Sequence, residues 1–197
     1  MLSKRKIKFF FFLYLIWSLI GAYADYAWLT MIPPYLIVFT AICSLYPPLL
    51  TIWYGLKLFG KKPPNFLTLW IVVGTMAYGV MAQIYFPLLM SWKGINFHDV
   101  GSMFWVAVYG IQTLILSKYL TKPNKLEIFF VITYLAIADY SHFALKTFVD
   151  FILPGYPTWL LQTAVIGGIS LQILAVLYYT LRPLKIPSTN PSPAISN

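Results

Sequence analysis

The sequence predicts an all-α fold, a polytopic transmembrane helical bundle of about six spans joined by short loops. Of the 197 residues, 60% are hydrophobic and only 10% are charged, and the mean hydropathy is +0.75. A soluble domain of this length could not bury so much apolar side chain. Since one span needs about 20 apolar residues, six spans fill the chain and leave no separate soluble domain.

The first predicted span covers 9–29 and follows a basic cytoplasmic segment, 1–8. Basic residues before a first span hold that end in the cytoplasm. A signal peptide is the rival interpretation, because Ala22-Tyr23-Ala24 forms a small-residue cleavage pattern before Asp25. The apolar run continues past this pattern, which favours a span, and removal of 1–24 stays open.

The second predicted span covers 34–59 and contains Pro47-Pro48 near its middle. Proline removes a backbone donor and clashes with the preceding turn, so this helix is expected to be kinked or broken there. The freed carbonyls need partners inside the bundle or beside a cavity. Two interpretations of the break stay open. It either shapes the packing of the helices or, as in transporters with broken helices, forms part of a binding site.

Four further spans complete the predicted bundle. Small residues within them, such as Gly74, Gly79 and Gly110, allow close helix contacts. The segment after the last span is rich in Pro, Ser and Asn, which is typical of a disordered cytoplasmic tail. The spans are 66–90, 100–119, 126–146 and 159–181, and the tail is 183–197.

The orientation follows from the Lys and Arg residues on alternate sides of the predicted spans. With the N-terminus inside, four precede the first span, three follow the second, three follow the fourth and two follow the sixth, so the inner side carries twelve of the 14. The outer side has only Lys93 and Lys146. The positive-inside rule therefore predicts a multi-pass plasma-membrane protein with both termini cytoplasmic. The net charge of +9 belongs to these loops, and nucleic acid is not an expected partner.

Asp139 is the carboxylate whose position most needs explaining. It stands about 13 residues into the fifth span, roughly 20 Å from the inner boundary at 1.5 Å per residue. An ionisable group at that depth is costly unless it is paired, protonated or facing water. In a helix, His142 and Lys146 would follow on the same face. This stripe indicates either structural pairing of Asp139 or an outer-half site for a proton, cation or polar solute.

Two further carboxylates, Asp25 and Asp99, lie in the same outer half and complete the candidate ligand or cation site with Asp139 and His142. Carboxylate and imidazole could share a metal ion, but the sequence assigns neither a metal nor a cofactor. The single cysteine, Cys43, excludes an intrachain disulfide. No motif for hydrolytic or nucleotide chemistry is present, so no catalytic residue is predicted and an enzyme is the less favoured class.

The chain resembles a family of uncharacterised bacterial and archaeal integral membrane proteins, the domain of unknown function 1405 family. The likeness runs from about Gly21 to Leu181 and is carried by three segments, which are 21–36, the stretch opening at Ala77-Tyr78-Gly79, and Ala138-Asp139-Tyr140 with His142-Phe143. This chain has Ala138 and His142 where the family has Asn and an acidic residue. The resemblance implies a polytopic membrane fold and no particular activity.

Three function classes follow from these features. The first is binding or transport of a small solute, cation or proton through an outward-facing polar pocket. The second is a non-catalytic subunit or assembly partner of a larger membrane complex, for which faces of small residues would suffice. The third, an enzyme acting on a lipid or quinone, has only the abundant aromatic residues in its favour. The bilayer is the expected environment in each case.

Overall fold

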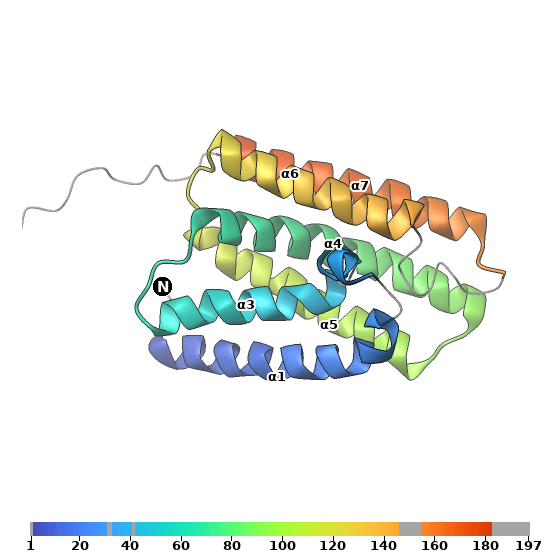
Figure 1. The fold of residues 1–197 in the computed structure, drawn as a ribbon, viewed down its shortest axis with the longest axis horizontal. Coiled ribbons are helices and arrows are strands. Elements are labelled where there is room, and N and C mark those ends of the chain that lie inside the picture. The colour runs from blue at the N-terminus through green and yellow to red at the C-terminus, as the bar shows by residue number, and fades with distance from the viewer. Residues whose placement is uncertain (1, 31–32, 41, 146–154, 183–197) are drawn as a thin grey trace, which may run out of the picture.

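The computed structural model describes residues 2–30, 33–40, 42–145 and 155–182, and every regular element in these ranges is helical. The long helices run roughly side by side along one axis (Figure 1). The elements are α1 (Lys4–Leu29), η1 (Pro34–Leu36), α2 (Ile37–Thr40), α3 (Ile42–Leu58), α4 (Asn65–Lys93), α5 (Phe97–Leu116), η2 (Ser117–Tyr119), α6 (Lys125–Asp139), the π-helical η3 (Tyr140–Ala144) and α7 (Thr158–Leu181). The all-α prediction is confirmed.

Five helical stretches in the described residues are long and apolar enough to cross a membrane. Their bounds are Lys4–Tyr23, Asn65–Lys93, Asp99–Tyr119, Lys125–Ala144 and Thr158–Leu181. They correspond to the first, third, fourth, fifth and sixth predicted spans. The predicted tail at 183–197 lies outside the described residues.

The second predicted span corresponds to a 3-10 turn, the four-residue α2 and the 17-residue α3. Residue 41, between α2 and α3, lies outside the described residues. The sequence predicts a kink or break near Pro47-Pro48, but both prolines lie inside α3, which runs as one helix from Ile42 to Leu58. The helix is therefore not broken at the proline pair.

Helix α4 is the centre of the bundle. It contacts α3, α5, α6 and α7, and about two-thirds of its most apolar stretch is buried, far more than in the other candidate spans. Glycines permit this packing: a Cβ added to Gly79 would lie 3.0 Å from Gly110 Cα of α5. Gly74 similarly faces the buried ring of Tyr46 from α3. These small residues are used inside the bundle.

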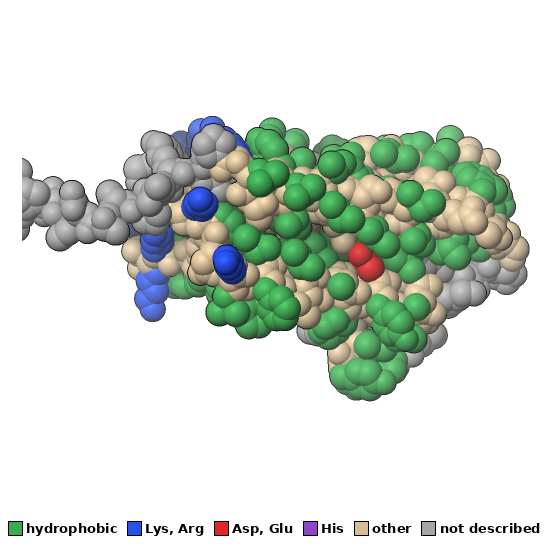
Figure 2. Space-filling view, turned by 90° about the horizontal axis from the view of Figure 1, so that it is seen from above, with side chains coloured by type: hydrophobic (Ala, Val, Ile, Leu, Met, Phe, Trp, Pro, Cys, Tyr) green, Lys and Arg blue, Asp and Glu red, His purple; other side chains and the backbone are tan. Residues whose placement is uncertain are grey.

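The two ends of the bundle differ in charge. Helices α1, α4 and α6 begin, and α3, α5 and α7 end, at the left of Figure 1. Figure 2 shows Lys and Arg side chains gathered at this same end, whereas the middle of the visible face is mainly hydrophobic. The basic residues of these helix ends and loops are Lys4, Arg5, Lys6, Lys8, Lys57, Lys61, Lys62, Lys118, Lys122, Lys125 and Arg182. We call this end of the bundle the basic end.

Candidate functional site

Asp139 is the last residue of α6 and is held by α7. Gln172 Nε2 donates a hydrogen bond to Asp139 Oδ1 at 2.8 Å, and the same nitrogen donates to the hydroxyl of Tyr78 at 2.9 Å. Tyr78 comes from the central helix α4. Three helices thus meet at one polar cluster, in which a neutral amide and a phenol accompany the carboxylate.

This cluster lies at the wall of a groove of about 290 Å³ between α6 and α7. Asp139 and Gln172 are its two polar lining residues, and the other walls are aliphatic. Figure 2 shows the outer face of α6 and α7, on which one acidic side chain is visible among hydrophobic ones. The lining residues are Ile132, Leu135, Ala136, Asp139, Ile169, Gln172, Ile173, Val176 and Leu177.

His142 does not extend this cluster in the way that the sequence predicted. The predicted stripe assumes α-helical spacing, but Tyr140–Ala144 form a π-helix in which the Leu145 N–H bonds to the Tyr140 carbonyl. The wider turn rotates successive side chains by a different angle, so residues three apart no longer stack. His142 is buried, and its Nδ1 donates to the Ala138 carbonyl at 2.8 Å. Lys146 lies outside the described residues.

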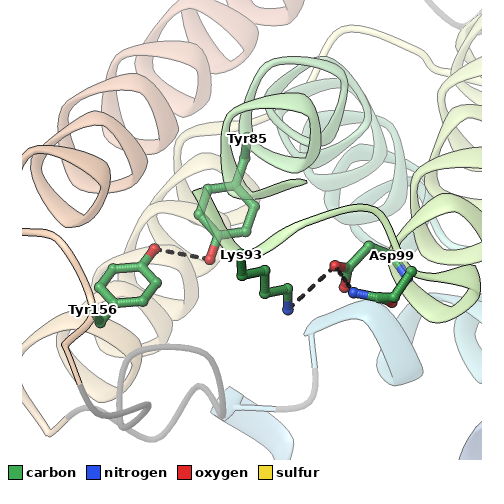
Figure 3. Close-up of polar contacts among 5 residues, drawn as sticks. Tyr85, Lys93, Asp99 and Tyr156 are labelled. Carbon is green, nitrogen blue, oxygen red and sulfur yellow. Dashed lines mark hydrogen bonds and ion pairs between the residues drawn. The ribbon is translucent and has the colours of Figure 1, made fainter. Parts of the chain in front are cut away.

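Asp99 belongs to a different cluster, at the junction of α4 and α5 (Figure 3). Lys93 Nζ lies 3.2 Å from its Oδ2, and the side chain of Asp99 is only 2% exposed. Asn96 caps α5 by accepting from the Asp99 N–H at 2.9 Å, and its amide also donates to the carboxylate. These contacts account for Asp99 as a residue that fixes the start of α5.

Beside this junction, Tyr85 joins the bundle to the segment before α7. Its hydroxyl lies 2.9 Å from that of Tyr156 (Figure 3). Trp92 packs edge-on against Tyr156, with ring centroids 5.6 Å apart. Among the described residues, an ion pair and a tyrosine pair thus connect helices at the end of the molecule opposite the basic end.

Three further polar residues that the predicted topology puts in the outer half, Asp25, His98 and Asp150, have side chains outside the described part of the structure. Asp25 lies in α1, but its side chain, like that of His98, lies outside the described part of the structure. Asp150 lies in 146–154, which is also outside it. Among the side chains that the structure does describe, no group of three His, Cys, Asp or Glu is arranged to hold a metal ion. Of the predicted residues whose side chains the structure describes, Asp139 lies at the groove between α6 and α7, and Asp99 lies at the separate junction of α4 and α5.

The sequence did not predict the other two members of this cluster, Gln172, which donates to Asp139, and Tyr78, which accepts from Gln172. Gln172 carries a usable signal, because an amide in the middle of an apolar span needs a hydrogen-bond partner from another helix. Tyr78 carries none, since it is one of 15 tyrosines, many of them in apolar stretches. The predicted spans contain four glutamines, Gln83, Gln112, Gln162 and Gln172, so the pattern alone does not single out Gln172 as the one that bonds to Asp139.

The comparisons with known proteins add no relative. No family model, no curated protein and no solved structure matches the chain. The resemblance to the domain of unknown function 1405 family therefore stays a prediction, and the helical membrane architecture is what the sequence and the structure together establish.

Proposed function

We propose that this chain is a multi-pass plasma-membrane protein that binds a small organic cation, one positive charge on an apolar body, at Asp139. The observation that carries the proposal is the placement of a single carboxylate, held by Gln172, at the wall of an otherwise aliphatic groove. No catalytic residue enters the proposal, and transport of the bound cation is its natural extension.

Charge is the first argument. Within the described residues the one ion pair is Lys93–Asp99, so Asp139 has no basic partner there. Gln172 supplies a hydrogen bond but no compensating charge. Because a carboxylate in an apolar membrane environment is costly without a counter-charge, a bound cation would stabilise this arrangement.

The walls of the groove decide which kind of cation fits. A bare metal ion such as Ca²⁺ takes about six to eight oxygen ligands, whereas this groove offers one carboxylate and one amide among aliphatic side chains. Apolar walls favour an apolar ligand body, and a charged group placed among them fixes its orientation. An ammonium carried on a ring or short chain meets both requirements.

The orientation in the membrane is part of the proposal. Basic loops are retained in the cytoplasm, so we place the basic end inside, with both chain termini cytoplasmic. Asp139 stands at the far end of α6 from Lys125, and its groove then belongs to the outer half of the membrane. In this orientation α3 and the short helices before it complete a sixth crossing.

The alternative function, a subunit or assembly partner of a larger complex, rested on faces of small residues. Gly74 and Gly79 use their small size in contacts within the bundle, whereas a Cβ added to Gly101 would meet no atom within 4 Å. Copurification of another membrane protein in a manner that depends on Asp139 would favour the alternative.

The test is equilibrium binding of phenethylammonium to the full chain in lipid nanodiscs, with empty nanodiscs subtracted. The uncharged analogue 3-phenylpropan-1-ol has a similar size and serves as the ligand control. We expect saturable binding of the ammonium and a loss of about 10- to 150-fold in Asp139→Asn, because hydrogen bonds to charged groups contribute about 1.5–3 kcal/mol.

Glu127→Gln is the matched protein control, since it neutralises another carboxylate of α6 that does not line the groove. Its affinity should equal that of the wild-type chain. Equal affinity of the wild-type chain and Asp139→Asn, or equal binding of the ammonium and the alcohol, would refute the proposal. Uptake of phenethylammonium into proteoliposomes then distinguishes a transporter from a protein that only binds the cation.

A further inference from the structure

A hollow with charged walls lies at the basic end, between the start of α1 and the segment that follows α5. Its volume is about 800 Å³, and it is separate from the groove of Asp139. The lining residues are Leu2, Ser3, Arg5, Lys6, Phe9, Phe10, Ile115, Lys118 and Tyr119. We call it the N-terminal pocket.

The charged groups of this pocket all have the same sign. Arg5 and Lys6 approach from α1, Lys118 approaches from η2, and none of the described residues that line the pocket is acidic. The one ion pair of the described residues, Lys93–Asp99, lies elsewhere. Three cations that surround one hollow repel one another, and a bound anion would relieve that repulsion.

Beyond the charged residues, Phe9 and Phe10 of α1 and Ile115 of α5 give the pocket an apolar wall. Phe9 is 61% exposed although it lies next to the pocket, and it packs edge-on against Phe10 with ring centroids 5.4 Å apart. Ile115 faces the two phenylalanines from α5. The pocket thus has a cationic rim and an apolar wall, which complement a ligand with an anionic head and a hydrocarbon tail.

The floor of the pocket is fixed by contacts to the core. The Leu2 N–H donates to the Tyr119 hydroxyl at 2.8 Å, which ties the start of the chain to the end of α5. Phe10 stacks on the buried Tyr54 at 5.3 Å. Because the walls are ordered before binding, less conformational entropy is lost when a ligand binds.

We propose that the N-terminal pocket binds an anionic phospholipid, with its phosphate between Arg5, Lys6 and Lys118 and one acyl chain along Phe9, Phe10 and Ile115. Free phosphate shares the headgroup chemistry, but it would leave the aromatic wall unused. Pockets that combine basic residues with an apolar wall at the end of membrane helices are suited to anionic headgroups. This lipid site is independent of the cation proposed at Asp139.

The experiment measures binding of short-chain dioctanoyl phosphatidylglycerol to the full chain in detergent by native mass spectrometry. Dioctanoyl phosphatidylcholine tests the net charge of the headgroup, and glycerol phosphate tests a free phosphate without acyl chains. We expect saturable binding of phosphatidylglycerol only. Arg5→Gln/Lys6→Gln/Lys118→Gln should weaken it about 100-fold, because each basic residue near a lipid headgroup contributes about 1 kcal/mol.

The matched control is Lys61→Gln/Lys62→Gln/Lys125→Gln, which removes the same charge from the basic end without touching the pocket lining. It should bind the lipid as the wild-type chain does. An equal loss in both triple variants would mean non-specific attraction and would overturn the proposal. Equal binding of phosphatidylcholine or of glycerol phosphate would also overturn it. The single variant Lys118→Gln, checked for folding by circular dichroism, gives a second measurement if the triple variant does not fold.

Discussion

The close approach of α4 and α5 makes a sharp prediction, because its two glycines are not equivalent. A Cβ on Gly79 would lie 3.0 Å from Gly110 Cα, 3.4 Å from the Gly110 nitrogen and 3.5 Å from the Val106 carbonyl. All three are backbone atoms and cannot rotate away. A Cβ on Gly110 would instead lie 3.8 Å from Gly79 Cα, an ordinary contact distance.

Gly79→Ala should therefore push the two helices apart by a few tenths of an ångström. Overpacking of this kind lowers the free energy of unfolding by about 1–3 kcal/mol. For a chain of this size, 1 kcal/mol corresponds to roughly 2–4 °C in melting temperature, so we expect a decrease of about 2–12 °C. Gly110→Ala should change the melting temperature little or raise it, since alanine is the better helix former.

Thermal unfolding in detergent micelles, followed by the fluorescence of the seven tryptophans, measures both variants in the same way. Size-exclusion chromatography confirms that each variant is monodisperse before heating. A decrease of the same size in both variants, or an unchanged Gly79→Ala, would show that the α4–α5 distance is not set by these two glycines.

Two further predictions concern polar contacts. Lys93→Met should lower the free energy of unfolding by about 1–3 kcal/mol, between the values for exposed and buried ion pairs, because it leaves the 2% exposed carboxylate of Asp99 without its ammonium. In a thermal double-mutant cycle, Lys93→Met/Asp99→Asn should recover most of this stability. Additive losses from the two substitutions would contradict the coupling. Asn124→Ala removes the capping box that Asn124 forms with Glu127 at the start of α6. Loss of this cap should lower the free energy of unfolding by about 1 kcal/mol and the melting temperature by roughly 2–4 °C. An unchanged melting temperature would show that the cap does not stabilise the bundle.

The positions of the long helices were predictable from sequence because hydropathy reports directly on contact with hydrocarbon. The third predicted span, 66–90, and the sixth, 159–181, match α4 and α7 to within a few residues at each end. The first prediction began at Phe9, but α1 begins at Lys4. A helix continues through the headgroup region, where its residues are basic, so hydropathy alone misses that turn.

The site was less predictable, because it depends on local geometry and on contacts between distant segments. Asp139 stood out as a carboxylate deep in a span. The π-helix that follows it, Tyr140–Ala144, contains His142 and changes the direction of that side chain, and the sequence has no clear signal for this π-helix. Gln172 is 33 residues from Asp139 in sequence, and only the packing of α7 on α6 brings them together. The sequence grouped Asp99 with Asp139 in one candidate site, yet a lysine and a capping asparagine hold Asp99 at the start of α5.

The central position of α4 has a consequence for the two proposed ligands, the organic cation and the phospholipid. A bundle built around a helix has side chains along its axis, so the hollows described above lie in seams between peripheral helices, α6 with α7 and α1 with α5. A ligand entering such a seam arrives sideways from the bilayer. The concentration that governs occupancy is then the concentration dissolved in the lipid, and apparent affinities expressed per volume of buffer will rise with the membrane partition coefficient of the ligand.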